Sequence, residues 1–220
     1  FKDDDNGNAS GSAYIYDYAS MNWNQTAKLS AGDGAANDQF GFSVSLSGDR
    51  ALVGAYLDDD KGSDSGSAYI YDYDGMNWSQ DAKLIAGDGK AYDNFGYSVS
   101  LSGGRALVGA YRDDDIGVNS GSAYIYDYDG MNWNLAAKLI AGDGAVNDNF
   151  GYSVSLSGNR ALVGAHRDDD NGSNSGSAYI YDYNGMNWSQ TAKLSAGDGS
   201  ANDEFGFSVS LSGDRALVGA

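Results

Sequence analysis

The chain has 220 residues, enough for one large domain with a buried core. It carries 13 Lys and Arg against 31 Asp and Glu, and the net charge of −18 argues against nucleic acid or an anionic membrane surface as a partner. Without cysteine it can form neither disulfides nor thiolate metal sites, and no apolar stretch approaches membrane-spanning length. We therefore expect no nucleic-acid binding and no membrane insertion.

A repeat of 55 residues runs through the whole chain. The segment Met-Asn-Trp begins at Met21, Met76, Met131 and Met186. Phe-Gly recurs at Phe40, Phe95, Phe150 and Phe205, and Arg-Ala-Leu-Val-Gly-Ala begins at Arg50, Arg105, Arg160 and Arg215. The four units fill the chain without remainder, and they differ mostly in segments that we expect to be loops.

Each unit predicts four short strands, as residues 96–140 illustrate. Residues 96–101 alternate Tyr, Val and Leu with Ser, and a period of two is typical of a strand. Residues 105–110 follow a Ser-Gly-Gly turn and predict the second strand, after which comes a long polar loop. Residues 123–128 place three tyrosines on one face of a third strand, and the next turn, Asp-Gly, favours a hairpin to a fourth strand at about 133–140.

Short antiparallel strands in regular groups of four predict an all-β fold, a β-propeller of four 55-residue blades with four antiparallel strands each. We expect a single repeat domain over residues 1–220, with blades at about 40–86, 95–141 and 150–196 and a split blade made of 205–220 and 1–31. The N- and C-terminal segments would share this last blade and so remove the open sheet edges. Alternatively, the units are part of a larger ring or array, in which two chains complete one ring or chains join end to end.

The pattern Phe150-Gly151 followed by Val163-Gly164-Ala165 resembles the FG-GAP repeat of integrin α-subunit propellers. The whole unit is more similar to bacterial and other extracellular FG-GAP repeats, which share its Asp-Asp-Asp-x-Gly-x-x-Ser-Gly-Ser-Ala-Tyr, Trp, Ala-Lys-Leu and Phe-Gly segments. The resemblance covers all four units and implies a propeller, an extracellular or cell-surface location, and a role in adhesion or protein recognition.

Two departures from the family pattern stand out. Where the family has Gly-Ala-Pro, this chain has Gly-Ala-Tyr or, at His166, Gly-Ala-His. The integrin-type calcium loop between the first and second strands is also missing, because residues 47–50 form a connection too short to wrap a cation. That metal site of the family is therefore not expected here.

Two acid-rich loops in each unit are the candidate binding sites. In a propeller, the loops from the second to the third strand and from the fourth to the next first strand emerge on one face. Hard cations such as Ca²⁺ take about six to eight oxygen ligands, mainly from carboxylates and carbonyls. The candidate metal ligands are Asp3, Asp5, Asp33, Asp38, Asp58, Asp60, Asp88, Asp93, Asp113, Asp115, Asp143, Asp148, Asp168, Asp170, Asp198 and Asp203. Alternatively, these aspartates cap turns and keep the face solvated.

The aromatic and arginine repeats each have two interpretations. The tryptophans and the tyrosine rows could stack on sugars, but every unit carries them at the same strand position, which favours packing between blades. The repeated arginine could bind an anion, but we expect it to pair with a neighbouring turn aspartate such as Asp49 or Asp214.

Catalysis is not expected. The single histidine, His166, occupies a position held by tyrosine in other units and is interpreted as a neutral substitution. The sequence has no cysteine nucleophile and no phosphate loop. Near-identical blades also do not supply the unlike residues that must converge in an active site.

Three functions are compatible with the sequence. The first is a non-enzymatic extracellular scaffold or adhesion protein, which uses a repetitive surface for structural assembly, including self-association, or for multivalent protein contact. The second is a Ca²⁺-dependent module that binds a carbohydrate or protein partner on the acidic loop face. The third is an engineered repeat protein without a ligand, because near-perfect repetition also fits a designed chain.

Overall fold

The computed structural model describes residues 2–220, and these form sixteen β-strands and no helix. Among them there is accordingly no helix long and apolar enough to cross a membrane. The strands are β1 (Ala13–Ala19), β2 (Asn22–Leu29), β3 (Ser43–Ser47), β4 (Arg50–Ala55), β5 (Ser67–Tyr73), β6 (Trp78–Leu84), β7 (Ser98–Ser102), β8 (Arg105–Ala110), β9 (Ser122–Tyr128), β10 (Trp133–Leu139), β11 (Phe150–Ser157), β12 (Arg160–Ala165), β13 (Ser177–Tyr183), β14 (Trp188–Leu194), β15 (Ser208–Ser212) and β16 (Arg215–Gly219).

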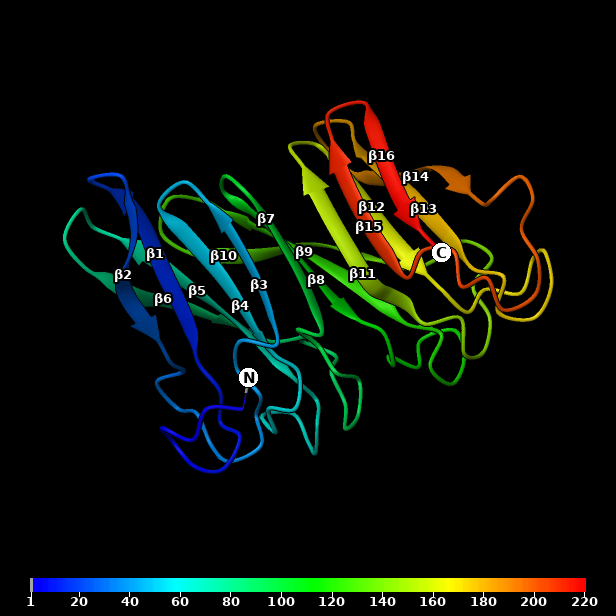
Figure 1. Ribbon diagram of the computed structural model, residues 1–220. Helices are drawn as coiled ribbons and strands as arrows, with labels where there is room; N and C mark the ends of the chain where they lie inside the picture. Colours follow the sequence, from blue (N-terminus) through cyan, green and yellow to red (C-terminus); the bar gives the residue numbers. More distant parts are fainter. Residues whose placement is uncertain (1) are drawn as a thin grey trace.

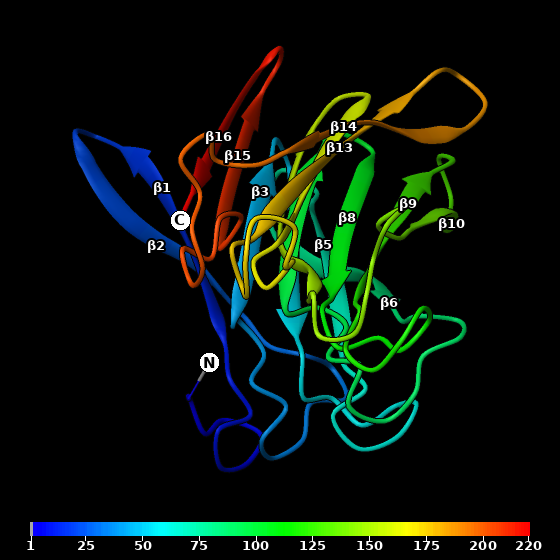
Figure 2. The ribbon, with the colours of Figure 1, turned by 90° about the vertical axis from the view of Figure 1, so that its right-hand side faces the viewer.

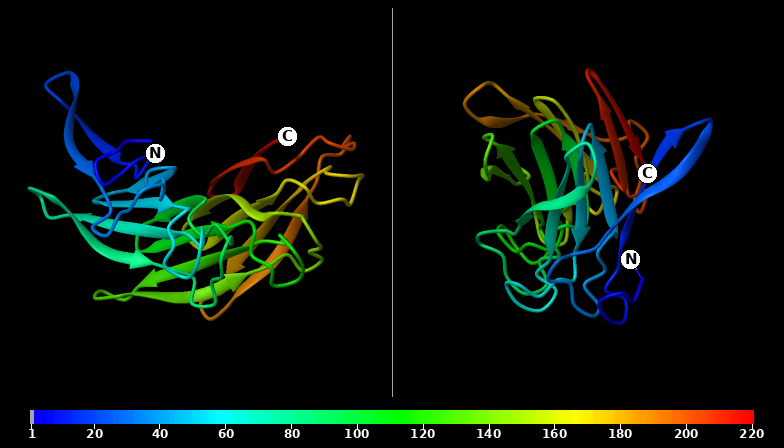
Figure 3. Two further views of the ribbon diagram at one scale, coloured as in Figure 1. Left: turned by 90° about the horizontal axis from the view of Figure 1, so that it is seen from below. Right: turned by 90° about the vertical axis from the view of Figure 1, so that its left-hand side faces the viewer.

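Three complete blades lie between two half-blades. Strands β3–β6, β7–β10 and β11–β14 each form a four-stranded antiparallel sheet in chain order, which confirms the predicted four-strand unit. The hairpins β1–β2 and β15–β16 each form a separate two-stranded sheet. The sheets follow one another along an open arc (Figures 1 and 3). The hairpin turns lie at one end of the sheets and the long loops at the other (Figure 2).

The predicted split blade is not confirmed. The hairpin β1–β2 lies at one end of the arc, and β15–β16 packs beside β11 at the other (Figure 1). No hydrogen-bonded pairing joins β1 to β16 in the described part of the chain. Local strand patterns do not settle closure, because closure depends on the angle between successive sheets.

The core lies between the faces of neighbouring sheets. On β8, Leu107 packs toward the sheet β11–β14, while Val108 belongs to the cluster shared with the preceding sheet, beside Leu52 and Ile70. A central strand is therefore buried on both faces and reads as a continuous apolar run rather than an alternating one. The half-buried Trp133 packs on the same cluster, as expected of inter-blade packing.

The Phe-Gly and Val-Gly-Ala segments meet where successive blades touch. The Ser98 hydroxyl donates to the Gly151 carbonyl oxygen over 2.8 Å. A Cβ on Gly109 would lie only 2.0 Å from that same oxygen, so the contact requires glycine. Phe95 packs edge-on against Tyr124 with ring centroids 5.4 Å apart. The repeated Phe, Gly and Ala residues thus set the spacing between blades.

The arginine that opens each second strand has a different partner from the expected one. Arg50 binds Asp72 on the next strand through two hydrogen bonds of 2.9 and 3.1 Å, and not the neighbouring turn residue Asp49. The reason is register, because β4 pairs with β5 so that Arg50 lies directly opposite Asp72. Arg105 and Arg160 also donate to a turn side chain of the following unit, Asn159 and Asp214 respectively.

Candidate functional site

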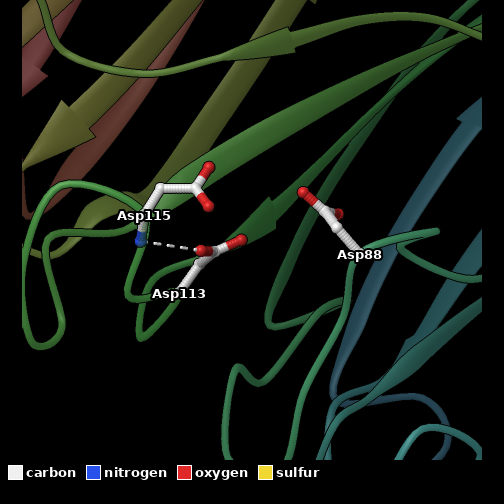
Figure 4. A group of neighbouring side chains, drawn as sticks. All are labelled: Asp88, Asp113 and Asp115. Carbon is white, nitrogen blue, oxygen red and sulfur yellow. Dashed lines mark hydrogen bonds between the residues drawn. The ribbon is translucent and has the colours of Figure 1, made fainter.

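Five side chains from three parts of the second complete blade and its preceding loop form a cluster, which we call the carboxylate–lysine cluster. Asp88 lies in the loop after β6, and Asp113 and Asp115 lie in the loop after β8. Tyr124 comes from β9 and Lys138 from β10. The carboxylates of the three aspartates face a common space (Figure 4).

The lysine ammonium binds all three carboxylates. Lys138 Nζ lies 2.7 Å from Asp88 Oδ2 and 3.0 Å from Asp113 Oδ2, and it also pairs with Asp115. An ammonium has three protons, so three carboxylates match its full hydrogen-bonding capacity. The lysine therefore acts as an internal cation at the position where the sequence suggested a metal.

The tyrosine hydroxyl and the backbone complete the arrangement. The Tyr124 hydroxyl lies 2.5 Å from Asp113 Oδ2 and 3.0 Å from Asp88 Oδ1, and its single proton serves one carboxylate at a time. The Asp115 amide donates to Asp113 Oδ1 over 3.1 Å (Figure 4). Asp113, 4% exposed, is thus held by three neighbours.

The same cluster recurs in the other complete blades, with Asp33, Asp58, Asp60, Tyr69 and Lys83 in one and Asp143, Asp168, Asp170, Tyr179 and Lys193 in the other. The N-terminal half-blade has an incomplete version. Its members Asp3, Asp5, Tyr14 and Lys28 are in contact, but among residues 2–220 no further loop aspartate joins them. Asp198, which would fill that role for a following unit, has no lysine beside it in residues 2–220.

The charges in the cluster stabilise one another. Burial alone would raise the pKa of Asp88, but the hydrogen bond and positive charge of Lys138 outweigh it and hold that pKa below its ordinary value. Burial alone would lower the pKa of Lys138, but the three carboxylates raise it instead. Burial and then the hydrogen bond to Asp113 raise the pKa of Tyr124. The lysine therefore stays protonated and the tyrosine neutral.

The second aspartate of each loop between blades lies outside the clusters. These residues accept a hydrogen bond from the backbone amide three positions earlier, as Asp148 does from Ala145 over 2.7 Å. The others of this set are Asp38, Asp93 and Asp203. Burial, together with nearby aspartates, raises the pKa of Asp148 to about 6. Of the sixteen predicted metal ligands, these four are turn-capping residues in the structure.

The cluster offers part of a calcium site. Carboxylate oxygens of Asp88, Asp113 and Asp115 lie within 4.8 Å of one another, which suits a hard cation in ligand type. A Ca²⁺ ion takes about six to eight oxygens, however, and would have to displace the ammonium of Lys138. Calcium binding stays a prediction, with displacement of the lysine as its condition.

Sequence reasoning missed the lysine and the tyrosine of the cluster. Lys138 lies 50 residues after Asp88 and on the outer strand of the next sheet, so only the fold brings them together. A signal was nevertheless present, because the Ala-Lys-Leu segment recurs in step with the aspartate triplets in every unit. A strictly repeated lysine on an acidic chain is a natural counter-charge for repeated carboxylates.

The comparisons with known proteins agree with the repeat geometry. Residues 23–71, 78–126, 133–181 and 188–220 match the FG-GAP repeat family. The chain belongs to the FG-GAP repeat family. Each match begins at the tryptophan of an outer strand, and together the matches confirm the resemblance read from the sequence.

Two further comparisons add little to this assignment. The crystal structure of Saccharomyces cerevisiae Sqt1 is similar to the FG-GAP chain with a TM-score of 0.43 and 14% identity, over 74% of this chain. The chain spans 37% of the length of that structure. A comparison with curated proteins found no match.

Proposed function

We propose that this FG-GAP repeat chain is a non-enzymatic scaffold that works outside the cell or at its surface, where copies join through their half-blades. The supporting observation is that the open edge of β16 and the open edge of β1 have complementary residues in matching register. FG-GAP repeats are typical of extracellular proteins, which supports the location. Such an assembly would present the same surface many times and suit adhesion or multivalent protein contact.

The complete sheets provide the template for the junction. Strand β4 pairs with β5 so that Arg50 lies opposite Asp72, and the other complete sheets use the equivalent register. The same pair recurs every 55 residues along the chain. If the second copy continues the repeat after residue 220 of the first, Arg215 of one copy lies opposite Asp17 of a second copy. The hairpins β15–β16 and β1–β2 would then form a four-stranded blade by strand addition.

Apolar surface is exposed where this blade would pack. Val44 and Leu46 on β3 are 62% and 60% exposed, whereas the equivalent Leu101 is 6% exposed. On the other half-blade, Leu217 is 74% exposed, whereas the equivalent Leu107 is fully buried. A hollow of about 450 Å³ lies beside β1, β3 and β4, and β15 and β16 of the joining copy would fill it. Covering these side chains would supply the hydrophobic driving force for association.

The acidic loops are complementary across the same junction. The N-terminal cluster holds Lys28 against Asp3 and Asp5 but lacks the loop aspartate that Asp88 supplies in a complete cluster. Asp198 of the copy that supplies β15 and β16 occupies the equivalent sequence position. Joining the two ends would therefore complete a fourth carboxylate–lysine cluster.

The repetition of the clusters also supports a non-enzymatic role. The same five residues, three Asp, one Tyr and one Lys, occupy the same positions in all three complete blades. An active site instead needs unlike groups that converge on one substrate. Repeated ion pairs with stable protonation states are suited to holding loops in place.

The test is the mass in solution, measured by light scattering over a range of concentrations. We expect the wild-type mass to rise above that of one chain, 23.0 kDa. Arg215→Asp alone and Asp17→Arg alone should each weaken association at least about tenfold, because like charges would then face each other. A mixture of the two variants restores opposite charges at every junction and should assemble again.

The control is Lys90→Asp, which reverses an exposed charge in the loop between β6 and β7, away from the junction, and should assemble like the wild type. A wild-type mass of one chain at all concentrations would contradict the proposal. So would two variants that fail to rescue each other when mixed.

A second candidate function is Ca²⁺-dependent binding of a protein or carbohydrate on the acidic face, which the convergence of Asp88, Asp113 and Asp115 favours. Calcium should then raise the melting temperature, and a chelator should reverse the effect. Identical melting curves with calcium and with chelator would contradict this candidate.

A further inference from the structure

A ladder of aromatic rings runs along the inner side of the arc, where the first strands of successive blades contact one another. Neighbouring rings in this ladder lie 4.0 to 5.7 Å apart between centroids. In chain order the rings are Phe42, Tyr56, Tyr97, Tyr111, Tyr152, His166 and Phe207. Six of these seven rings belong to phenylalanine or tyrosine, and the seventh is the imidazole of His166.

A hollow of about 420 Å³ lies at this imidazole. Its aromatic lining includes Tyr111, Tyr152 and Phe207, and Phe207 is 48% exposed. His166 also lines it, at the position where the preceding units carry the larger Tyr56 and Tyr111. The exchange of a phenol for a shorter imidazole provides room that a tyrosine would take.

The imidazole is buried and incompletely bonded. His166 is 4% exposed, yet its Nδ1 has no hydrogen-bond partner among residues 2–220. A buried polar atom without a partner destabilises the fold, so such atoms are rare in native proteins. Burial, and secondarily the charge of Arg167, lowers the pKa of His166 to about 4. The ring is therefore neutral near pH 7 and offers one donor and one acceptor.

Two arginines and one glutamate also line the hollow. Arg112 and Arg167 lie two residues after the ends of β8 and β12, and both are exposed. Asn149 donates to the Tyr111 and Asn119 carbonyl oxygens over 3.3 and 3.2 Å, which fixes this part of the lining. Glu204 occupies the position equivalent to Asn149, and its carboxylate accepts hydrogen bonds but cannot donate them.

These groups restrict the chemistry of an occupant. A guanidinium binds a carboxylate with paired hydrogen bonds, whereas the carboxylate of Glu204 disfavours a dense polyanion and favours hydroxyl donors. Hydroxyls would also match the unpartnered nitrogen of His166, and the exposed ring of Phe207 offers an apolar face for stacking. The lining is thus largely polar with aromatic faces beside it, so an occupant should carry several hydrogen-bonding groups.

We propose that this hollow binds a sugar ring that carries a single carboxylate, with Arg167 on the carboxylate, His166 and Glu204 on hydroxyls, and Phe207 against the ring face. The site is separate from the carboxylate–lysine clusters and needs no calcium. Phe207 lies on the half-blade that the proposed junction would cover, so uronate binding is measured in the Arg215→Asp background, in which that junction is weakened. Its test can therefore fail or succeed independently of the assembly.

The chain has a single histidine, which gives a clean spectroscopic reporter. The probes are glucuronate and galacturonate, added to protein labelled with ¹⁵N or ¹³C in histidine and followed by NMR. We expect a saturable shift of the His166 imidazole signals with at least one uronate, and shifts at least about tenfold weaker with glucose or acetate at equal concentration. No saturable shift with either uronate, or equal responses to acetate, would overturn the proposal.

Two variants borrow residues from other units and so should fold. Arg167→Leu copies Leu57, keeps the histidine reporter, and should weaken uronate binding about tenfold by removing a charge-assisted bond. His166→Tyr copies Tyr56, refills the hollow, and should abolish binding measured by calorimetry. Lys61→Leu removes an exposed charge elsewhere and should leave binding unchanged. Unaltered binding in both site variants would also overturn the proposal.

Discussion

Asp148→Asn should stabilise the protein, and more strongly at high pH. Burial raises the pKa of the Asp148 carboxyl from 3.8 to about 6, so the folded state disfavours its ionised form. The folded state consequently holds this proton more tightly than the unfolded state, and the contribution of Asp148 to stability falls as pH rises from about 4 to 6. Asparagine cannot ionise, yet its carbonyl oxygen can still accept the 2.7 Å hydrogen bond from the Ala145 amide.

The magnitude follows from the size of the shift. A difference of about 2.2 pKa units corresponds to about 3 kcal/mol of lost stability at pH 8, where the wild-type carboxylate must be ionised. At pH 5 the Asp148 carboxyl of the folded wild type is largely protonated, and the loss of stability is only about 1.6 kcal/mol. The variant should therefore gain about 1.4 kcal/mol more over the wild type at pH 8 than at pH 5.

Urea unfolding at the two pH values measures this difference, which is independent of any fixed cost of the substitution. Asp203→Asn is the matched control. Asp203 accepts the same hydrogen bond from Ser200 but is exposed, so its variant should change stability by less than about 0.5 kcal/mol at both pH values. A gain for Asp148→Asn that does not grow with pH would refute the reasoning.

Two further substitutions test the cluster and the contact between blades. Lys138→Met leaves three carboxylates without their ammonium and should lower the free energy of unfolding in urea by about 3 kcal/mol at neutral pH. Lys90→Met, at an exposed site, should change it very little. Equal stability of the two variants would refute the structural role of the cluster. Gly109→Ala places a Cβ 2.0 Å from the Gly151 oxygen and should lower the free energy of unfolding by about 3 kcal/mol. Gly104→Ala meets only ordinary contacts and is the control. A Gly109→Ala variant as stable as this control would contradict the described spacing between blades.

The strands could be predicted because their signals are local. The alternation in residues 96–101 and the Asp-Gly turn before the fourth strand depend on neighbours in sequence. The repeat shows the alternation in all four units and the Asp-Gly turn in two. Strand ends shifted slightly, since β7 begins at Ser98 and not at Gly96. In the third complete blade β11 instead begins at Phe150 and includes Gly151, so this boundary varies between units.

The clusters and the open ends could not be predicted in the same way. The candidate aspartates were identified, but their partner Lys138 lies on another strand, and only the sheet register brings Nζ to the carboxylates. Arg50 was assigned to an adjacent turn residue, because sequence proximity does not reveal the cross-strand partner Asp72. His166 was interpreted as a neutral exchange, because neither its burial nor the hollow beside it is visible in sequence.

The measurement that tests the junction most directly is cysteine cross-linking between copies, since the chain has no cysteine of its own. In the proposed register Leu217 of one copy lies opposite Ile15 of the next. A mixture of Leu217→Cys and Ile15→Cys chains should therefore give a disulfide-linked pair in high yield, whereas Leu217→Cys mixed with Asn24→Cys, on the far strand, should not.

Equal yields in the two mixtures would contradict assembly through the half-blades. So would a double Leu217→Cys, Ile15→Cys chain that cross-links only within itself, since that result would mean a single chain closes its own ring. Linked pairs in the first mixture alone are the result that assembly predicts.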